Sequence, residues 1–398
     1  MKIAVIIETS LGTGGGFDQA LNATLQMQRL CSGRYGFEVF TSKPGNIEIL
    51  ARLGVAAEQI YVTISDRSLA RVVNSALWHI VQRRLRFVGK IERKLLSRQV
   101  DLVYFVTPSN LPLGLQRLNF ITTLWDLCHR DNPEFPEVRA FGEFYARENT
   151  HRNLVASAYL TLCDSCNLAQ LASFRYGVDR DRFLPMPFGV SPLLDRQKSL
   201  STEQVQKKYK IPQHYYYYPA QFWAHKNHIR ILDALAILRD QHNYRPAVVF
   251  SGKDFGSLDW VLRSIRERRL ELQVFILGFI PSDEVRGLYE GAAAIVMPTY
   301  FGPTNLPPLE AWSVGVPLIY SRHLFAQVQD AAELVDPDDS QSVADAMLRI
   351  LSDERRSQLV SAGVRRLYEI ELKRHSAEQL LALRLEQYSK RVMLWRFK

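Results

Sequence analysis

The stretch AAAIVMPTYFGPTNLPPLEAWSVGVPLIYS, residues 292–321, holds two short apolar runs with a polar loop and a helix-like segment between them. Short apolar runs bounded by turn residues are typical of buried strands. The helix is expected to begin at Pro307 or Pro308, because proline suits the first helical turn. A strand, a loop, a helix and a second strand, in this order, predict one step of a parallel α/β sheet. Glu310 is the only acid of the stretch, just inside the predicted helix.

Strand-like and helix-like runs alternate along the whole chain. The strand-like runs are short and rich in β-branched or aromatic residues, and they cover residues 2–8, 36–42, 60–65, 101–107, 120–126, 159–165, 215–220, 247–252, 273–279, 294–299 and 317–321. Helical patterns separate most of them, and residues 342–391 are helical in pattern throughout. Such alternation predicts parallel sheets with helices on both faces. We therefore expect an α/β fold with two doubly wound, Rossmann-like domains.

A chain of 398 residues exceeds what a single hydrophobic core usually supports. The alternation breaks at residues 188–201, a stretch with a long polar run, and this is the predicted domain junction. The prediction places an N-terminal domain at residues 1–188, a C-terminal domain at 202–370, and a C-terminal helix at 371–398 that packs back on the N-terminal domain. Ligands of open parallel sheets bind beyond the carboxyl ends of the strands, so a cleft between the domains is the expected substrate site.

The composition indicates a soluble, cytoplasmic protein. Hydrophobic residues make up 47% of the chain and charged residues 23%, a balance typical of globular proteins. The sequence has no apolar stretch of about 18 residues, which a membrane helix would need. Four cysteines in a chain of this length do not indicate a disulfide scaffold. The formal net charge of +9 favours an anionic partner, such as a membrane surface or a phosphate-rich substrate.

The basic residues concentrate in RRLRFVGKIERKLLSR, residues 83–98, where seven basic side chains accompany one acid, Glu92. Apolar residues recur among them at helical spacing, so an amphipathic helix is predicted. Two interpretations stay open: a helix that docks on a membrane surface or a partner, and a helix that packs inward and keeps its charges in solvent. No nucleic-acid partner is expected, because the stretch lacks the interleaved aromatic residues that stack on bases.

A glycine-rich turn, LGTGGGFDQAL at residues 11–21, follows the first predicted strand. Glycines there let the backbone approach a ligand closely, and the helix start beyond them favours an anion. Phe17 takes the place of the third glycine of a dinucleotide-binding G-x-G-x-x-G pattern. A phosphate- or acceptor-contacting turn formed by Gly14, Gly15 and Gly16 is therefore favoured over a dinucleotide site, with a plain tight turn as the alternative.

Two features predict an anion site in the second domain. Lys226 follows the first strand of that domain, where its ammonium group can reach an anion, and Asn227 is expected to cap the next helix. In the opening stretch, backbone amides at the helix start, together with Thr304 and Asn305, can cradle a diphosphate. Glu310 would then accept hydrogen bonds from ribose hydroxyls. The structural alternative is a carboxylate that only stabilises the helix dipole.

In their order along the chain, these features resemble the retaining glycosyltransferases of family 4, which have the GT-B fold, and specifically those of bacterial polysaccharide and lipopolysaccharide biosynthesis. The resemblance runs through nearly the whole chain. It implies an acceptor-binding N-terminal domain and a C-terminal domain that binds a nucleotide sugar. Besides the glycine-rich turn, it is carried by the blocks TTLWDL, LCDSCNLAQLASFRYGV, HKN, VFILGFIPSDEVRGLYEGAAAIVMPT, LPPLEAWSVGVPLI and AELVDPDDSQSVADAMLRIL.

The resemblance assigns donor-binding roles in the second domain. Lys226 matches the phosphate-binding lysine of the family, and Glu310 matches the acid that holds the donor ribose. Asn305 and Leu306 match the loop whose amides approach the sugar and the phosphate. Gly302 stands where the family has an additional glutamate, which touches the donor sugar in many members. Different contacts to the sugar are therefore implied here.

A second group of positions completes the implied donor site. Gln221 stands near the position of a basic residue in the family, and Lys253 is the candidate that supplies the missing charge. The segment that matches the family's nucleobase-contacting backbone consists of Gly278, Phe279 and Ile280.

The resemblance also implies acceptor-side residues in the first domain. Trp125 and Asp126 fall at the position of the family's His-Asp pair, so the histidine is displaced. His129 follows shortly after and is expected to take its place near the acceptor. The implied catalytic residues are thus Lys226, Asp126 and His129.

The implied reaction is the retaining transfer of a hexose, of the mannose or rhamnose class, from a GDP-, UDP- or dTDP-linked donor to a glycan or lipid-linked glycan acceptor in cell-surface polysaccharide biosynthesis. No metal or other cofactor is expected, and DPDD at residues 336–339 is interpreted as a helix cap. The expected location is the cytoplasm, with peripheral contact at the inner face of the membrane. The alternatives are a nucleotide-sugar epimerase of the same fold and a non-catalytic nucleotide-sugar-binding protein, which Gly302, Gln221 and Trp125 would suit.

Overall fold

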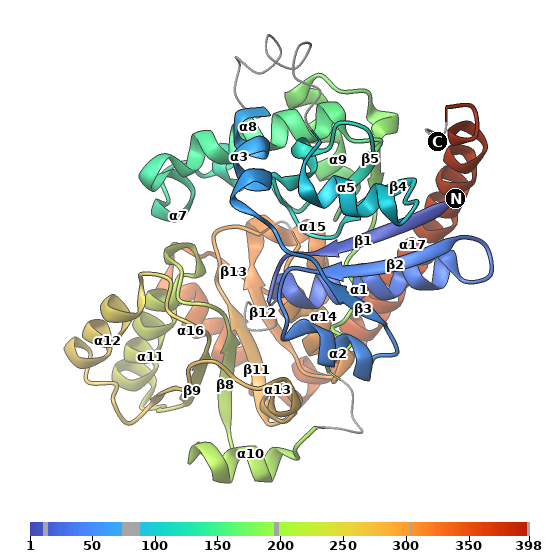
Figure 1. The fold of residues 1–398 in the computed structure, drawn as a ribbon. Helices are drawn as coiled ribbons and strands as arrows, with labels where there is room; N and C mark the ends of the chain where they lie inside the picture. The colour runs from blue at the N-terminus through green and yellow to red at the C-terminus, as the bar shows by residue number, and fades with distance from the viewer. Residues whose placement is uncertain (11–14, 74–87, 195–198, 303, 396–398) are drawn as a thin grey trace. The chain divides into compact units, whose positions relative to one another are not determined.

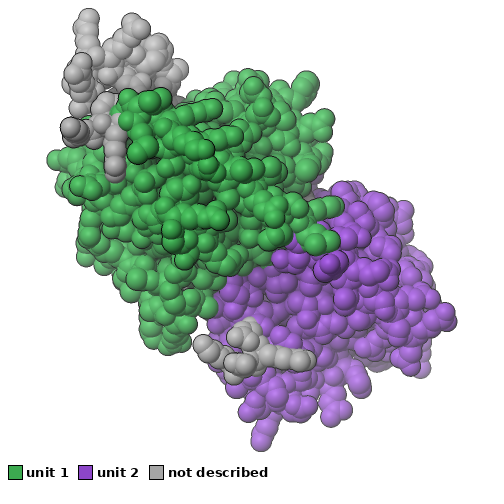
Figure 2. Space-filling model, turned by 90° about the vertical axis from the view of Figure 1, so that its right-hand side faces the viewer, with its two compact units in different colours: residues 1–130, 141–189, 372–398 green, residues 131–140, 190–371 purple. Residues whose placement is uncertain are grey.

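The structure is a computed structural model, and it describes residues 1–10, 15–73, 88–194, 199–302 and 304–395. The chain forms two compact units, which Figure 2 colours separately. Unit 1 consists of residues 1–130, 141–189 and 372–398, and unit 2 of residues 131–140 and 190–371. Each unit contains its own parallel sheet, and each is described by itself below.

Unit 1 is built on a seven-stranded parallel sheet in the order β3-β2-β1-β4-β5-β6-β7. The strands are β1 (Lys2–Ile7), β2 (Gly36–Thr41), β3 (Ala57–Gln59), β4 (Leu102–Phe105), β5 (Asn119–Leu124), β6 (Leu160–Cys163) and β7 (Phe183–Pro185). The helices include α1 (Gly15–Cys31), α2 (Asn46–Arg52), α3 (Ile64–Val73), α5 (Lys90–Ser97), α6 (Cys128–Asp131), α8 (Glu143–Ser157) and α9 (Cys166–Tyr176). The strand order reverses beside β1, as in doubly wound sheets.

Unit 2 is built on a six-stranded parallel sheet in the order β10-β9-β8-β11-β12-β13 (Figure 1). The strands are β8 (Tyr215–Pro219), β9 (Ala247–Ser251), β10 (Val274–Ile276), β11 (Ala292–Met297), β12 (Leu318–Ser321) and β13 (Glu333–Val335). Its helices include α7 (Pro136–Arg139), α10 (Thr202–Tyr209), α11 (His228–His242), α12 (Leu258–Glu267), α13 (Ser282–Glu290), α14 (Leu306–Ser313), α15 (Phe325–Val328) and α16 (Ser340–Arg349). The predicted α/β class with two doubly wound sheets is confirmed.

The last helix, α17 (Asp353–Val392), contributes to both units, since unit 1 begins again at Leu372. In unit 1, the side-chain amide of Gln26 donates to Glu378 at 2.8 Å, and the hydroxyl of Tyr388 donates to the carbonyl of Asp101 at 2.9 Å. The helical run predicted from residue 342 is interrupted at residues 350–352, between α16 and α17.

Four consecutive tyrosines, Tyr215–Tyr218, form the central strand β8 and are all fully buried. Burying a hydroxyl is costly unless it has a hydrogen-bond partner. Each of these hydroxyls has one, and their partners, in chain order, are the Leu288 carbonyl, the Met347 carbonyl, the Ser251 hydroxyl and the Lys226 carbonyl. The strand thus anchors its neighbouring helices and loops through side-chain tips.

Some predicted strands differ from the observed ones. The strand expected at residues 60–65 is wrong, because β3 ends at Gln59 and α3 begins at Ile64. The strands β7 and β13 were not predicted. Each has three residues, too few to show a periodic pattern, and each pairs in parallel with a longer strand.

Residues 131–140 belong to unit 2, although the prediction included them in the N-terminal domain. The reason is local packing. The carboxylate of Glu137 accepts the backbone N–H of His225 at 2.9 Å. The ring of Phe135 packs edge-on against Phe301, with 5.3 Å between the centroids. These contacts join the segment to the loops that follow β8 and β11.

The described part of the basic segment forms α5, and its apolar face is in the core of unit 1. Ile91 and Leu95 are buried there. Glu92 is also buried and accepts backbone N–H groups of residues 116–118. Lys94 and Arg98 form ion pairs with Glu58 outside the core. The inward-packing interpretation therefore holds for α5, while Arg83, Arg84 and Arg86 lie outside the described residues.

Candidate functional site

The predicted donor-binding residues lie in loops at one edge of the unit 2 sheet. All six strands of this sheet are parallel, so the loops that follow β8, β9, β10 and β11 emerge at the same, carboxyl edge. The strand order reverses between β8 and β11 (Figure 1), which makes this pair the topological switch point. Ligands of doubly wound sheets bind outside such a point.

Lys226 and Asn305 meet at the switch point. Lys226 ends a short 3-10 helix after β8, and Asn305 precedes α14 in the loop after β11. The Lys226 ammonium donates to Oδ1 of Asn305 at 3.1 Å. The Asn305 amide group in turn donates to the Gly302 carbonyl and to the Tyr320 hydroxyl, both at 2.7 Å. Asn305 therefore holds the lysine in place from a fixed side-chain orientation.

Asn227 does not cap α11 with its side chain, contrary to the prediction. Its amide group donates instead to the carbonyls of Pro298, at 3.0 Å, and Pro337, at 2.8 Å. Its backbone is left-handed, with φ 58°, a conformation that asparagine tolerates better than most residues. Asn227 thus ends the short helix directly after Lys226 and ties this loop to the loops that follow β11 and β13.

The start of α14 offers fewer amides than the sequence suggested. The helix begins at Leu306, and Pro307 and Pro308 follow it, so these two positions have no N–H to donate. The N–H of Asn305 is already bonded to Oε1 of Gln327 at 3.0 Å. An anion at this helix start would therefore meet the N–H of Leu306 rather than a cradle of several amides. Thr304, directly before Asn305, is half-buried.

Gly302 adopts a backbone conformation that only glycine accommodates easily, with φ 110°. A Cβ atom at this position would lie 2.7 Å from Oδ1 and 2.9 Å from Nδ2 of Asn305. The side chain of Asn305 thus occupies the space that a larger residue at position 302 would need. This explains why a glutamate is not compatible with the local geometry.

Glu310 is the fifth residue of α14, because the helix begins at Leu306 and not at Pro307 or Pro308, and its side chain is largely buried. The hydroxyl of Tyr289, from α13, donates to its Oε2 at 2.5 Å. The Tyr289 ring packs edge-on against Tyr217 of β8, with 5.3 Å between the centroids. The carboxylate is therefore oriented by a neighbour that sequence analysis did not identify.

Gln221 and Lys253 are adjacent, at the carboxyl ends of β8 and β9. The backbone N–H of Lys253 donates to the side-chain oxygen of Gln221. The Lys253 ammonium is exposed and lies 4.8 Å from the centre of the Phe279 ring. Gly278 lies in the neighbouring loop, after β10, and its carbonyl accepts the N–H of Gly252. Ile280, which follows in that loop, is buried.

On unit 1, the glycine-rich turn and the Trp125-Asp126 dipeptide come together. Gly15 and Gly16 form the first turn of α1 rather than a loop, and Gly14 lies outside the described residues. A Cβ atom on Gly16 would lie 3.2 Å from the Trp125 ring, so glycine allows this close contact. Asp126 is half-buried, and its Oδ1 accepts the N–H of Cys128 at 2.9 Å.

His129 does not lie where an acceptor can reach it, which corrects the prediction. Its side chain is 0% exposed, and its Nε2 lies 3.2 Å from Oε2 of Glu148. Burial lowers the pKa of His129, against the opposing influence of Glu148. Hydrogen bonds from Arg130 hold the pKa of Glu148 well below its usual range. His129 is thus part of a buried polar cluster inside unit 1.

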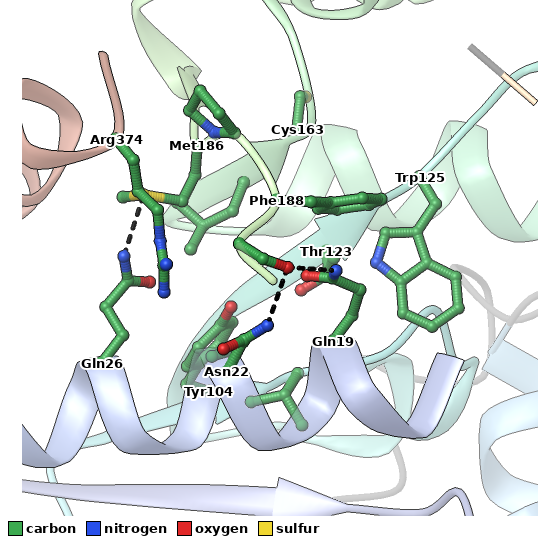
Figure 3. A pocket seen from close by; sticks show the side chains of 15 residues that line it. Gln19, Asn22, Gln26, Tyr104, Thr123, Trp125, Cys163, Met186, Phe188 and Arg374 are labelled. Atoms are coloured by element: carbon green, nitrogen blue, oxygen red, sulfur yellow. Dashed lines mark hydrogen bonds between the residues drawn. The ribbon is translucent and has the colours of Figure 1, made fainter. Parts of the chain in front are cut away.

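A cavity of about 30 Å³ lies in unit 1 beside α1 (Figure 3). The side chains of Gln19 and Asn22 point from α1 to the carbonyl of Gly189, to which Asn22 donates at 3.1 Å. Trp125 and Arg374 also line the cavity. A volume of this size accommodates about one water molecule, so the cavity is too small for a sugar.

The described residues also bear on metal sites and membrane spans. Within the described ranges, no group of three or more His, Cys, Asp or Glu side chains is arranged to hold a metal ion. Asp339, in the acidic run before α16, caps that helix by accepting the N–H of Gln341 at 2.9 Å. No helix in the described part of the chain is both long and apolar enough to span a membrane.

Comparisons with known proteins point to one class. Residues 201–366 match the family model for Glycosyl transferases group 1. The chain is 26% identical over 266 residues to the O-antigen chain mannosyltransferase B of Escherichia coli. The aligned region covers 66% of this chain and 68% of that protein.

Solved structures share the fold. HepE of Anabaena, in complex with UDP-glucose, superposes with a TM-score of 0.69 at 17% identity, covering 97% of this chain and all of that one. WaaG, a glycosyltransferase involved in lipopolysaccharide biosynthesis, has a TM-score of 0.64 at 14% identity, covering 96% of this chain and 98% of that one. The chain therefore has the GT-B fold. With the family match in unit 2, it is a glycosyltransferase.

Proposed function

We propose that the protein is a retaining glycosyltransferase of family 4 that transfers a hexose from a nucleoside diphosphate sugar during cell-surface polysaccharide biosynthesis. The observation that carries the proposal is the bond between Lys226 and Asn305 at the switch point of the unit 2 sheet. It holds a cation where the diphosphate of a nucleotide binds in doubly wound sheets. The E. coli O-antigen mannosyltransferase and the UDP-glucose complex of HepE support this choice of donor class and pathway.

The proposed chemistry uses charge stabilisation. As the bond between the sugar and the diphosphate breaks, negative charge develops on the β-phosphate, and the Lys226 ammonium with the Leu306 N–H stabilises it. Glu310, oriented by Tyr289, accepts hydrogen bonds from the ribose. Lys253 and Phe279 lie at the neighbouring loops, on the side that we assign to the base. The acceptor hydroxyl attacks from the face that the diphosphate leaves, and its proton passes to a phosphate oxygen.

The sugar and the acceptor are the finer part of the proposal. A mannose or rhamnose donor and a glycan or lipid-linked glycan acceptor fit the relation to the O-antigen mannosyltransferase. Asp126 remains the proposed acceptor-side residue, since it is half-buried near the glycine-rich helix start of unit 1. We also propose that the reaction needs no metal ion. Full activity in excess chelator is expected, and activity that is lost and then restored by magnesium would contradict this point.

The proposal is tested by nucleotide binding and by variants. Of GDP, UDP and dTDP, at least one should raise the thermal unfolding midpoint of the protein. Lys226→Ala should bind this nucleoside diphosphate about 100-fold more weakly, which corresponds to about 3 kcal/mol. Glu310→Ala should weaken binding of the nucleoside as well. Intact affinity in both variants would refute the assigned site. Epimerised donor in the absence of any acceptor would favour an epimerase instead.

A further inference from the structure

Glu137 is far in the sequence from the main part of unit 2, residues 190–371, yet it contacts the residue next to Lys226. Glu137 lies in the short helix α7, between β5 and α8 of the other unit, yet its segment packs within unit 2. Its side chain is 5% exposed. Its Oε1 accepts the backbone N–H of His225 at 2.9 Å and is also bonded to Nδ1 of the same residue. One carboxylate oxygen thus holds both the main chain and the ring of His225.

Aromatic side chains enclose this contact. The ring of His225 stacks on Phe301, with 3.8 Å between the centroids and 13° between the planes. Phe135, from the same segment as Glu137, packs edge-on against both rings. Such packing excludes water and strengthens the hydrogen bonds that it encloses. Phe135 and Glu137 therefore restrain the position of the His225 ring.

His225 also connects the two loops that form the proposed diphosphate site. Its carbonyl accepts the N–H of Tyr300 at 2.9 Å and the hydroxyl of Thr299 at 3.2 Å. These two residues belong to the loop after β11, which leads to Asn305, while His225 immediately precedes Lys226. A change in the position of His225 would therefore shift Lys226 relative to Asn305.

The electrostatics of Glu137 favour its ionised form. Burial would raise the pKa of this carboxyl, but hydrogen bonds from the His225 ring and backbone outweigh burial and hold the pKa below its usual range. An ionised carboxylate at Nδ1 requires a proton there, so it sets the protonation and orientation of the imidazole.

We propose that Glu137 is a positioning residue for Lys226, acting through His225 on the recognition of the β-phosphate of the donor. The inference rests on the proposed function of Lys226 as the diphosphate-binding cation. It assigns a role in donor binding to the segment at residues 131–140, which lies outside the matched family region in the sequence. Glu137 is not proposed to touch the substrate.

The experiment compares a nucleoside diphosphate with its monophosphate. The nucleotide among GDP, UDP and dTDP that binds the wild type most tightly is titrated into each variant by calorimetry, and so is its monophosphate. Glu137→Ala should lose about ten-fold in affinity for the diphosphate and keep its affinity for the monophosphate, which lacks the β-phosphate. Glu137→Gln, which retains an acceptor for the His225 N–H, should recover part of the loss.

The matched control is Glu143→Ala. Glu143 is 44% exposed and pairs only one turn away with Arg147, so its loss should leave both affinities unchanged. In a Lys226→Ala background, Glu137→Ala should cause no further loss for the diphosphate, since both act on one interaction.

Several outcomes would overturn the inference. The first is that Glu137→Ala binds both nucleotides as tightly as the wild type, while Lys226→Ala no longer prefers the diphosphate. This result would remove the role of Glu137 and leave the proposed function standing. An equal loss for both nucleotides, or additive losses in the double variant, would show that Glu137 only supports the fold. Absence of binding of all three diphosphates to the wild type would refute the proposed function itself, and the inference with it.

Discussion

At the residue scale, a half-buried residue of unit 1 carries a carboxyl group that is not fully hydrogen-bonded. Glu8 directly follows β1, and its Oε1 has no hydrogen-bond partner among the described residues. Burial raises its pKa to about 7, although Ser109, Arg67 and Lys43 act in the opposite direction. The group is therefore protonated in the folded protein at a pH where it is ionised in the unfolded chain.

The raised pKa of Glu8 predicts that the stability of the folded protein depends on pH. Between pH 4.5 and 7 the unfolded chain binds fewer protons at Glu8 than the folded chain, so the free energy of unfolding falls as pH rises. Up to about 3 kcal/mol is expected from this shift. Glu8→Gln should be more stable than the wild type at pH 8 and nearly equal at pH 4, as measured by urea unfolding. The same difference at both pH values would contradict the assignment.

Gly302 supports a second prediction at this scale. In Gly302→Ala, a left-handed φ and a collision with the Asn305 amide combine, so the variant should lose stability, by about 1–3 kcal/mol. It should also bind the nucleoside diphosphate about ten-fold more weakly, because Asn305 no longer holds Lys226. Gly315→Ala is the control, because its φ is 72° but its Cβ would have only an ordinary contact, at 3.9 Å. Equal binding losses in both variants would exclude the specific mechanism.

At the element scale, strand β8 links the core of unit 2 to the site. The Tyr218 hydroxyl donates to the Lys226 carbonyl at 2.8 Å, whereas the Tyr216 hydroxyl donates to the Met347 carbonyl at 2.6 Å, at α16. Both side chains are buried in the same strand. They differ in whether the bond reaches the proposed site.

Tyr218→Phe and Tyr216→Phe should therefore separate stability from binding. Each substitution removes one buried hydrogen bond, which should lower the free energy of unfolding by about 1 kcal/mol. Only Tyr218→Phe should weaken diphosphate binding, by a few-fold, since the loop that carries Lys226 loses an anchor. Comparable binding in the two variants would mean that β8 does not position the lysine.

At the scale of the whole molecule, charge is the feature that bears on partners. The net charge is +9, and the apolar face of α5 is buried in the core, so that face is not available for insertion into a bilayer. An attraction of α5 to an anionic membrane would then be electrostatic. Such attraction weakens as salt rises, because ions screen charges over about 10 Å.

Charge neutralisation tests this. A variant with glutamine in place of Arg83, Arg84, Lys90 and Arg93 should bind vesicles that contain anionic lipid more weakly than the wild type, with a smaller salt dependence. Vesicles of neutral lipid serve as the control and should bind neither protein. Unchanged binding to anionic vesicles would exclude the basic segment as the contact.

Much of the fold could be predicted from local pattern. Ten of the eleven predicted strands correspond to observed ones, and an example is β8, where four aromatic residues precede a proline. Lys226 and Glu310 could be proposed as site residues because each lies near the end of a strand or the start of a helix, and these positions are local. The three-residue strand β13 pairs in parallel with the longer strand β12, and its own sequence is too short to show a local pattern.

The sequence by itself determined the α/β class, the two sheets and the loops of the proposed donor site, because hydrophobic periodicity and turn residues act over a few neighbours. Only the tertiary structure decided which side chains meet in those loops. Tyr289 orients Glu310, and Gln327 accepts the backbone N–H of Asn305. Glu137 binds His225, which is 88 residues away in the sequence. Tertiary packing also buried His129. Such contacts depend on how distant segments pack, and spacing along the chain carries no information about them.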